Sequence, residues 1–200
     1  MNESSTGSRA CEVDVSNPIP VKIVVAGGFA VGKTTFVGSI SDIDPLTTEA
    51  NMTSVSEGVD DLGEATTKRG TTVAMDFGRV ALSDDLVLYV FGTPGQDRFH
   101  FMWDELVRGA IGAVVLVDTD RLDACFPAVD YMEQTGVPFV VAINAFDGVL
   151  HHHPDDVREA LDVPPHVPVV VTDARHKAAV RDSIVALVRH AMAMATAHTG

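Results

Sequence analysis

Short apolar runs alternate with longer stretches of mixed polarity along most of the chain. Six runs rich in β-branched and aliphatic residues lie at positions 21–26, 73–82, 86–91, 113–117, 139–143 and 167–171. Four or five of them are continuously apolar, which is typical of strands buried on both faces of a parallel sheet. The alternation therefore predicts an α/β fold built from βαβ units, with a six-stranded, mainly parallel sheet and helices on both faces.

The run at residues 73–82 differs from the others because polar and apolar residues are mixed in it. It is followed by Ser83-Asp84-Asp85, a turn composition, and then directly by the run at residues 86–91. This arrangement predicts a hairpin in which residues 73–82 form the one antiparallel strand, at an edge of the sheet.

Helical stretches are separated by Gly, Pro and Asp residues. They are predicted at residues 33–41, around 98–108, and at 122–134, 154–161 and 177–195. Between residues 41 and 72 no periodic pattern is evident, and loops longer than about 12–15 residues are uncommon in compact domains unless they are functional or disordered. This stretch is therefore predicted to be one or the other.

Size and charge limit the classes of function. A chain of 200 residues corresponds to one domain, which we expect over residues 19–200 after a polar, disordered leader at residues 1–18. The formal net charge of −14 disfavours nucleic-acid binding, which needs clustered Lys and Arg. Two cysteines fit a reducing compartment, so we expect a cytoplasmic protein. No lipidation motif or apolar run of spanning length is present, so membrane recruitment is expected only through a partner.

The strongest motif follows the first apolar run. Gly27-Gly28-Phe29-Ala30-Val31-Gly32-Lys33-Thr34 fits G-x-x-x-x-G-K-S/T, the phosphate-binding loop, and Thr35 continues it into a predicted helix. Its glycines allow backbone N–H groups to face phosphate oxygens, and the helix adds its positive end. We expect Lys33 to bridge β- and γ-phosphate oxygens and the Thr34 hydroxyl to ligate Mg²⁺.

Two segments concern the base of the nucleotide. Asn144-Ala145-Phe146-Asp147 resembles the N-K-x-D signature of Ras-like GTPases, with Ala145 where lysine is usual. The resemblance implies that Asp147 accepts from the guanine ring N–H and amine, and that Asn144 ties the base loop together. Because that lysine stacks along the base, its loss is expected to weaken affinity more than base preference. An ordinary turn at the end of a strand is the alternative.

The second base segment is Thr172-Asp173-Ala174-Arg175, which resembles the S-A-K loop of the same proteins. The resemblance implies that the backbone N–H of Ala174 meets the base carbonyl. A simple strand-to-helix turn is again the alternative.

Two further segments resemble switch regions. Thr72-Val73-Ala74-Met75-Asp76-Phe77 is similar to the switch I threonine and the strand after it, which implies that Thr72 ligates Mg²⁺, with Thr71 as the rival. Gly92-Thr93-Pro94-Gly95-Gln96 matches D-x-x-G-Q of switch II except at Gly92. The match implies that Gly95 turns its N–H toward the γ-phosphate and that Gln96 orients the attacking water. In the family, the aspartate at the position of Gly92 holds a Mg²⁺-bound water. Since losing such an indirect contact with the metal often lowers metal affinity or activity by about 10–100-fold, we expect slow turnover or weak Mg²⁺ dependence.

Together these motifs resemble the bacterial Ras-like small GTPases, in particular those of actinobacterial conservon operons, relatives of the gliding-motility GTPase MglA. The resemblance implies a P-loop NTPase fold, GTP/GDP and Mg²⁺ as cofactors, slow GTP hydrolysis, and switch loops around residues 43–72 and 92–108. It also implies roadblock-type and sensor-kinase-like regulatory partners. Members of the group similarly lack the switch II Asp, so Gly92 is compatible with activity.

Arg69 precedes Thr72 by three residues, a spacing that resembles the built-in arginine of heterotrimeric G-protein α subunits. Such an arginine accelerates hydrolysis by about 10³–10⁵, whereas a solvated loop residue is the alternative. The Arg69→Ala change is expected to slow single-turnover hydrolysis by about tenfold or more.

Two other functions stay open: a nucleotide-locked scaffold with little hydrolysis, and a P-loop ATPase or small-molecule kinase, which would not need the Asn144 and Asp147 pair.

Overall fold

The sheet of the protein contains one more strand than the sequence predicts. The computed structural model describes residues 17–44, 46–52, 71–95 and 97–197. Their strands are β1 (Ile19–Ala26), β2 (Leu46–Met52), β3 (Thr71–Ser83), β4 (Leu86–Gly92), β5 (Gly112–Val117), β6 (Phe139–Asn144) and β7 (Val169–Thr172). They form a seven-stranded sheet in the order β2-β3-β4-β1-β5-β6-β7. The six predicted strands and the predicted α/β fold class are confirmed, and β2 is the addition.

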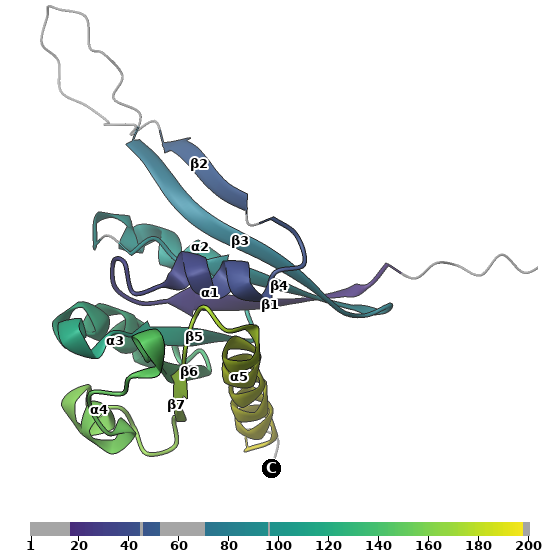
Figure 1. The fold of residues 1–200 in the computed structure, drawn as a ribbon. Coiled ribbons are helices and arrows are strands. Elements are labelled where there is room, and N and C mark those ends of the chain that lie inside the picture. Colours follow the sequence, from purple (N-terminus) through teal and green to yellow (C-terminus); the bar gives the residue numbers. More distant parts are fainter. Residues whose placement is uncertain (1–16, 45, 53–70, 96, 198–200) are drawn as a thin grey trace, which may run out of the picture.

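The position of the antiparallel strand needs a correction. β3 is antiparallel to β4, as predicted, but it is not at the edge, because β2 pairs antiparallel along its other side from Leu46↔Phe77 to Met52↔Thr71. Figure 1 shows β2 and the outer part of β3 projecting as a ribbon beyond the other strands. An edge strand of this kind is held by backbone hydrogen bonds and needs no continuous apolar run, so its sequence carries little periodic signal.

Helices cover both faces of the sheet, as predicted. The α-helices are α1 (Lys33–Ile40), α2 (Trp103–Val107), α3 (Phe126–Thr135), α4 (Pro154–Ala160) and α5 (Lys177–Ala197), and the 3-10 helices are η1 (Asp97–Met102), η2 (Thr119–Cys125) and η3 (Phe146–Gly148). One buried cluster joins the sheet to α2, α3 and α4, and a second joins it to α1 and α5. In the described part of the chain, no helix combines the length and the apolarity needed to cross a bilayer.

The parallel strands place five connecting segments at one end of the sheet. β1, β4, β5, β6 and β7 run in the same direction, so their carboxyl ends meet there. The segments that follow these strands are the phosphate loop, the segment from Thr93, η2, the segment from Asn144 and the segment from Thr172. In open α/β sheets, ligands bind at the carboxyl ends of the strands. The predicted leader lies almost wholly outside the described residues.

Candidate functional site

The phosphate loop has a backbone that depends on its glycines. Gly27 and Gly32 have φ angles of 138° and 104°, in the left-handed region that side chains disfavour, and Ala30 has a φ of 60°. A Cβ at Gly27 would lie 2.5 Å from the Leu116 carbonyl oxygen, and one at Gly32 would lie 2.8 Å from Asn144 Nδ2. The motif therefore forms a tight strand–loop–helix turn, which is the arrangement that binds phosphate groups.

Lys33 lies at the centre of this loop. Lys33 is only 7% exposed, and its Nζ donates to the carbonyl oxygens of Gly27 at 2.9 Å and Gly28 at 2.6 Å. Burial lowers the pKa of Lys33 from 10.5 to about 8, with a partial opposing effect of the Asp76 charge. A Cβ on Gly95 would lie 2.6 Å from Nζ. The lysine amine is thus held between the phosphate loop and Gly95.

The remaining loop residues divide by exposure. Val31 is buried, whereas Phe29 is 63% exposed and Thr35 is exposed as well. The Val31 side chain belongs to the buried cluster that joins the sheet to α1 and α5. Nucleotide contacts of Phe29, Val31 and Thr35 stay predictions.

Thr34 contacts a carboxylate for which the sequence pattern predicted no role. Its Oγ1 donates to Asp76 Oδ2 at 2.7 Å, and Asp76 is 9% exposed. In the register of the β3–β4 pair, Asp76 lies opposite Gly92, and a Cβ on Gly92 would be 3.2 Å from Asp76 Oδ2. A carboxylate from the neighbouring strand therefore lies close to Gly92, the position at which the D-x-x-G-Q pattern has an aspartate.

These oxygens fit the cation that a P-loop fold implies. Mg²⁺ prefers oxygen ligands and is usually bound through one or two protein groups together with substrate phosphates. Thr34 and Asp76 are a hydroxyl and a carboxylate in direct contact beside the phosphate loop. Among the described residues, no group of three or more His, Cys, Asp or Glu side chains is placed to hold a metal ion. A cation at Thr34 and Asp76 would therefore need phosphate oxygens or water as its other ligands.

Asn144 connects the phosphate loop to the loop after β7. Its buried side chain donates from Nδ2 to the Val31 carbonyl oxygen at 2.9 Å and accepts at Oδ1 from the Ala174 N–H at 3.0 Å. Asn144 thus ties together the segments that the sequence assigned to phosphate and base. The bond predicted from the Ala174 N–H to a base carbonyl competes with the bond to Asn144, and it stays a prediction.

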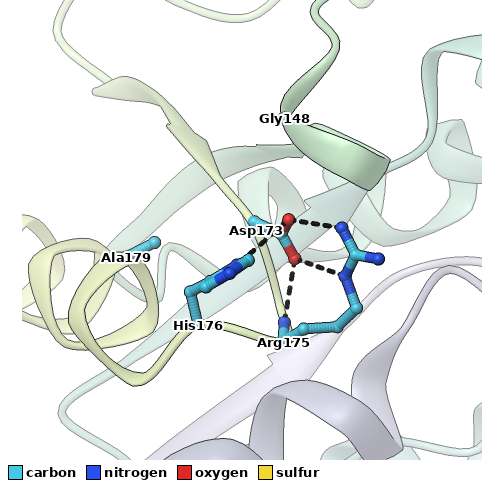
Figure 2. A pocket seen from close by; sticks show the side chains of 5 residues that line it. All are labelled: Gly148, Asp173, Arg175, His176 and Ala179. Atoms are coloured by element: carbon cyan, nitrogen blue, oxygen red, sulfur yellow. Dashed lines mark hydrogen bonds and ion pairs between the residues drawn. The ribbon is translucent and has the colours of Figure 1, made fainter.

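An open depression of about 610 Å³ lies between η3 and the segment that follows β7 (Figure 2). It is lined by Gly148, Asp173, Arg175, His176 and Ala179. Arg175 donates from Nε at 3.0 Å and from Nη2 at 2.7 Å to the two carboxylate oxygens of Asp173. These bonds hold the pKa of Asp173 well below its usual range, so the pair stays ionised. A flat guanidinium is therefore fixed next to the segment that follows Asp147.

Several predicted residues lie beyond what the structure describes. Gln96 and Arg69 are outside the described residues, so their catalytic roles stay predictions. Thr72 and Asp147 are described only in their backbones, where Thr72 pairs with Asn51 in the β2–β3 ladder and Asp147 belongs to η3. The proposed contacts of their side chains with Mg²⁺ and guanine, and the choice between Thr71 and Thr72, also stay predictions.

Comparisons with known proteins agree with this architecture. Two solved structures of the cytosolic domain of the T. maritima FeoB iron transporter share the fold. The apo form has a TM-score of 0.60 and 16% identity, covering 86% of this chain and 64% of that one. GDP form I has a TM-score of 0.61 and 15% identity, covering 88% and 65%. This chain thus spans just under two thirds of those solved chains.

Two further comparisons rest on sequence. An uncharacterized protein of Methanocaldococcus jannaschii is 30% identical over 129 residues, which cover 64% of this chain and 71% of that protein. The family model described as "Conserved hypothetical ATP binding protein" matches residues 25–194, from the end of β1 into α5. The match includes the phosphate loop, Asp76 and Asn144, and the chain therefore belongs to this family of conserved hypothetical ATP binding proteins.

Proposed function

We propose that this protein is a guanine-nucleotide switch, which binds GTP and GDP and hydrolyses GTP slowly. The observation that carries the proposal is the position of Asn144. Its side chain connects the phosphate loop, in which the Lys33 amine is bound, to Ala174 in the segment that resembles the S-A-K loop. Membership of a family described as ATP binding supports a nucleotide ligand, and one solved relative in fold is a GDP form. The resemblance of residues 144–147 to N-K-x-D favours guanine over adenine.

Phosphate binding follows from the charges at the loop. Lys33 loses its hydration on burial, so an anionic phosphate is the partner that restores the stability of its charged form. The loop N–H groups and the start of α1 add fixed dipoles in the same direction. Thr34 and Asp76 would hold Mg²⁺, which supplies charge neutralisation at the β- and γ-phosphate oxygens when bound.

Hydrolysis would depend on residues of the two switch segments. We propose that Gln96 orients a water molecule for attack on the γ-phosphorus, while the bond to the bridging oxygen breaks and GDP and phosphate are released. Gly95 would donate its N–H to the transferred group, and Arg69 would stabilise its charge. Thr72 at the start of β3 would couple nucleotide state to residues 43–72, because contact with the γ-phosphate is lost on hydrolysis.

The cellular setting of the switch is part of the same proposal. We propose a domain over residues 19–200 that acts in the cytoplasm, with roadblock-type and sensor-kinase-like partners and any membrane recruitment through them. These partners rest on the resemblance to conservon-operon GTPases alone.

Two alternatives have specific support. The description of the family favours ATP, and Ala145 in place of lysine favours a nucleotide-locked scaffold that scarcely hydrolyses. Single-turnover assays with GTP and with ATP, each with excess protein and with Mg²⁺ present or chelated, separate all three. Conversion of GTP in preference to ATP supports the proposal. Conversion of ATP alone overturns it, and tight GTP binding without conversion favours the scaffold.

A further inference from the structure

The 3-10 helix η2 covers the outer side of the phosphate loop. A Cβ on Gly28 would lie 2.8 Å from the carbonyl oxygen of Ala124 and 2.9 Å from its Cβ. Cys125, at the end of η2, is fully buried. The segment after β5 therefore packs directly on the loop that is proposed to hold phosphate.

Arg121, in the middle of η2, is fastened at this contact. Its Nε and Nη2 donate to Asp118 Oδ2 at 2.9 and 2.7 Å, and the same Nη2 reaches the Ala30 carbonyl oxygen at 3.4 Å. The Asp118 carboxylate is itself fixed, because its Oδ1 accepts from the Asp120 N–H at 3.0 Å. The Arg121 side chain is 47% exposed, compared with 11% for Asp118. The guanidinium is thus anchored on one side and open to a ligand on the other.

Arg121 and Asn144 contact consecutive carbonyl groups of the phosphate loop. Arg121 contacts the carbonyl of Ala30, and Asn144 contacts the carbonyl of the following residue, Val31. Asp118 and Ala145 also line one small cavity of about 30 Å³. A lysine side chain at position 145 would therefore start across this cavity from Asp118, the anchor of Arg121.

We infer that Arg121 supplies the cation that Ala145 lacks, with its planar guanidinium lying along the base and ribose of the bound nucleotide while it fastens the phosphate loop through Ala30. This inference rests on the proposed function. A guanidinium suits the position because it stays charged and stacks on flat π-systems. The bond to Asp118 restrains the side chain from folding onto the phosphates and reduces the entropy lost on stacking.

The first test is the affinity for GDP, measured by titration calorimetry. Arg121→Ala is expected to weaken GDP binding by about tenfold, the size of a partly desolvated cation–π contact, while binding of inorganic tripolyphosphate changes less than threefold. Arg181→Ala is the matched control, because Arg181 forms an exposed pair with Asp182 on α5, and it should leave both affinities unchanged. Equal losses for GDP and tripolyphosphate would overturn the inference and make Arg121 a brace of the loop.

The second test is restoration of the cation from the other side of the cavity. Ala145→Lys introduced into Arg121→Ala is expected to recover most of the lost GDP affinity, and Arg121→Lys, which leaves residue 145 untouched, should retain more affinity than Arg121→Ala. Failure of both variants to exceed Arg121→Ala would refute the role of the cation. Failure of the wild-type protein to bind GDP would instead refute the proposed function, so the two failures are distinguishable.

Discussion

We expect Lys33 to make nucleotide binding sensitive to pH in a range where an ordinary lysine would not titrate. The perturbation is a change from pH 7 to pH 9. Burial lowers the pKa of Lys33 to about 8 in the free protein. Phosphate oxygens beside the amine favour its charged form, so the pKa rises when a nucleotide binds. Binding above pH 8 therefore requires uptake of a proton, and affinity falls as pH rises through 8.

The magnitude follows from the fraction of protonated lysine. A group with a pKa of about 8 is roughly 90% protonated at pH 7 and roughly 10% protonated at pH 9. If only the protonated form binds well, the GDP affinity falls about tenfold across this interval, or about 1.4 kcal/mol. A lysine with the ordinary value of 10.5 would leave the affinity almost unchanged.

Titration calorimetry in two buffers of different ionisation enthalpy measures both the affinity and the protons taken up. We expect close to one proton per bound GDP at pH 9 and close to none at pH 7. Lys33→Met should bind more weakly and lose this difference, because it has no amine to titrate. A wild-type affinity that stays constant from pH 7 to 9, with no proton uptake, would refute the reasoning about burial.

Three further predictions concern contacts that the structure describes. Asp76→Asn should reduce the gain in GTP affinity from Mg²⁺ by about tenfold, measured with and without a chelator, and an unchanged gain would mean that the contact with Thr34 does not serve the cation. Gly95→Ala should weaken GDP binding by about tenfold or more at unchanged thermal stability, because its Cβ would lie 2.6 Å from Lys33 Nζ; normal affinity would show that the amine moves aside without cost. Asn144→Ala should lower the free energy of unfolding by about 2–4 kcal/mol, since a buried carbonyl and a buried N–H lose their partner, and a loss below about 0.5 kcal/mol in urea titrations would contradict this.

Contacts between segments distant in the sequence explain which site residues and which strand the sequence did not predict. Asp76 stood in the segment identified by its resemblance to switch I, but its place beside Gly92 follows from the β3–β4 register, which pairs residues sixteen positions apart. The turn at residues 83–85 was the signal that could have indicated this pairing. Arg121 gave no such signal, because its contact with Ala30 joins residues from different loops. β2 was missed because an edge strand is held by backbone bonds rather than by an apolar pattern.

The sequence by itself determined the elements whose causes are local. Apolar runs predicted six strands because burial on both faces leaves a continuous pattern, and the phosphate loop was recognisable because its glycines, Lys33 and Thr34 are contiguous. Only the tertiary structure decided which groups meet at the carboxyl ends of the parallel strands: Asp76 with Thr34, Asn144 with Val31 and Ala174, and Arg121 with Ala30. The reason is that strand register and loop packing depend on pairings between distant segments, which no local period encodes.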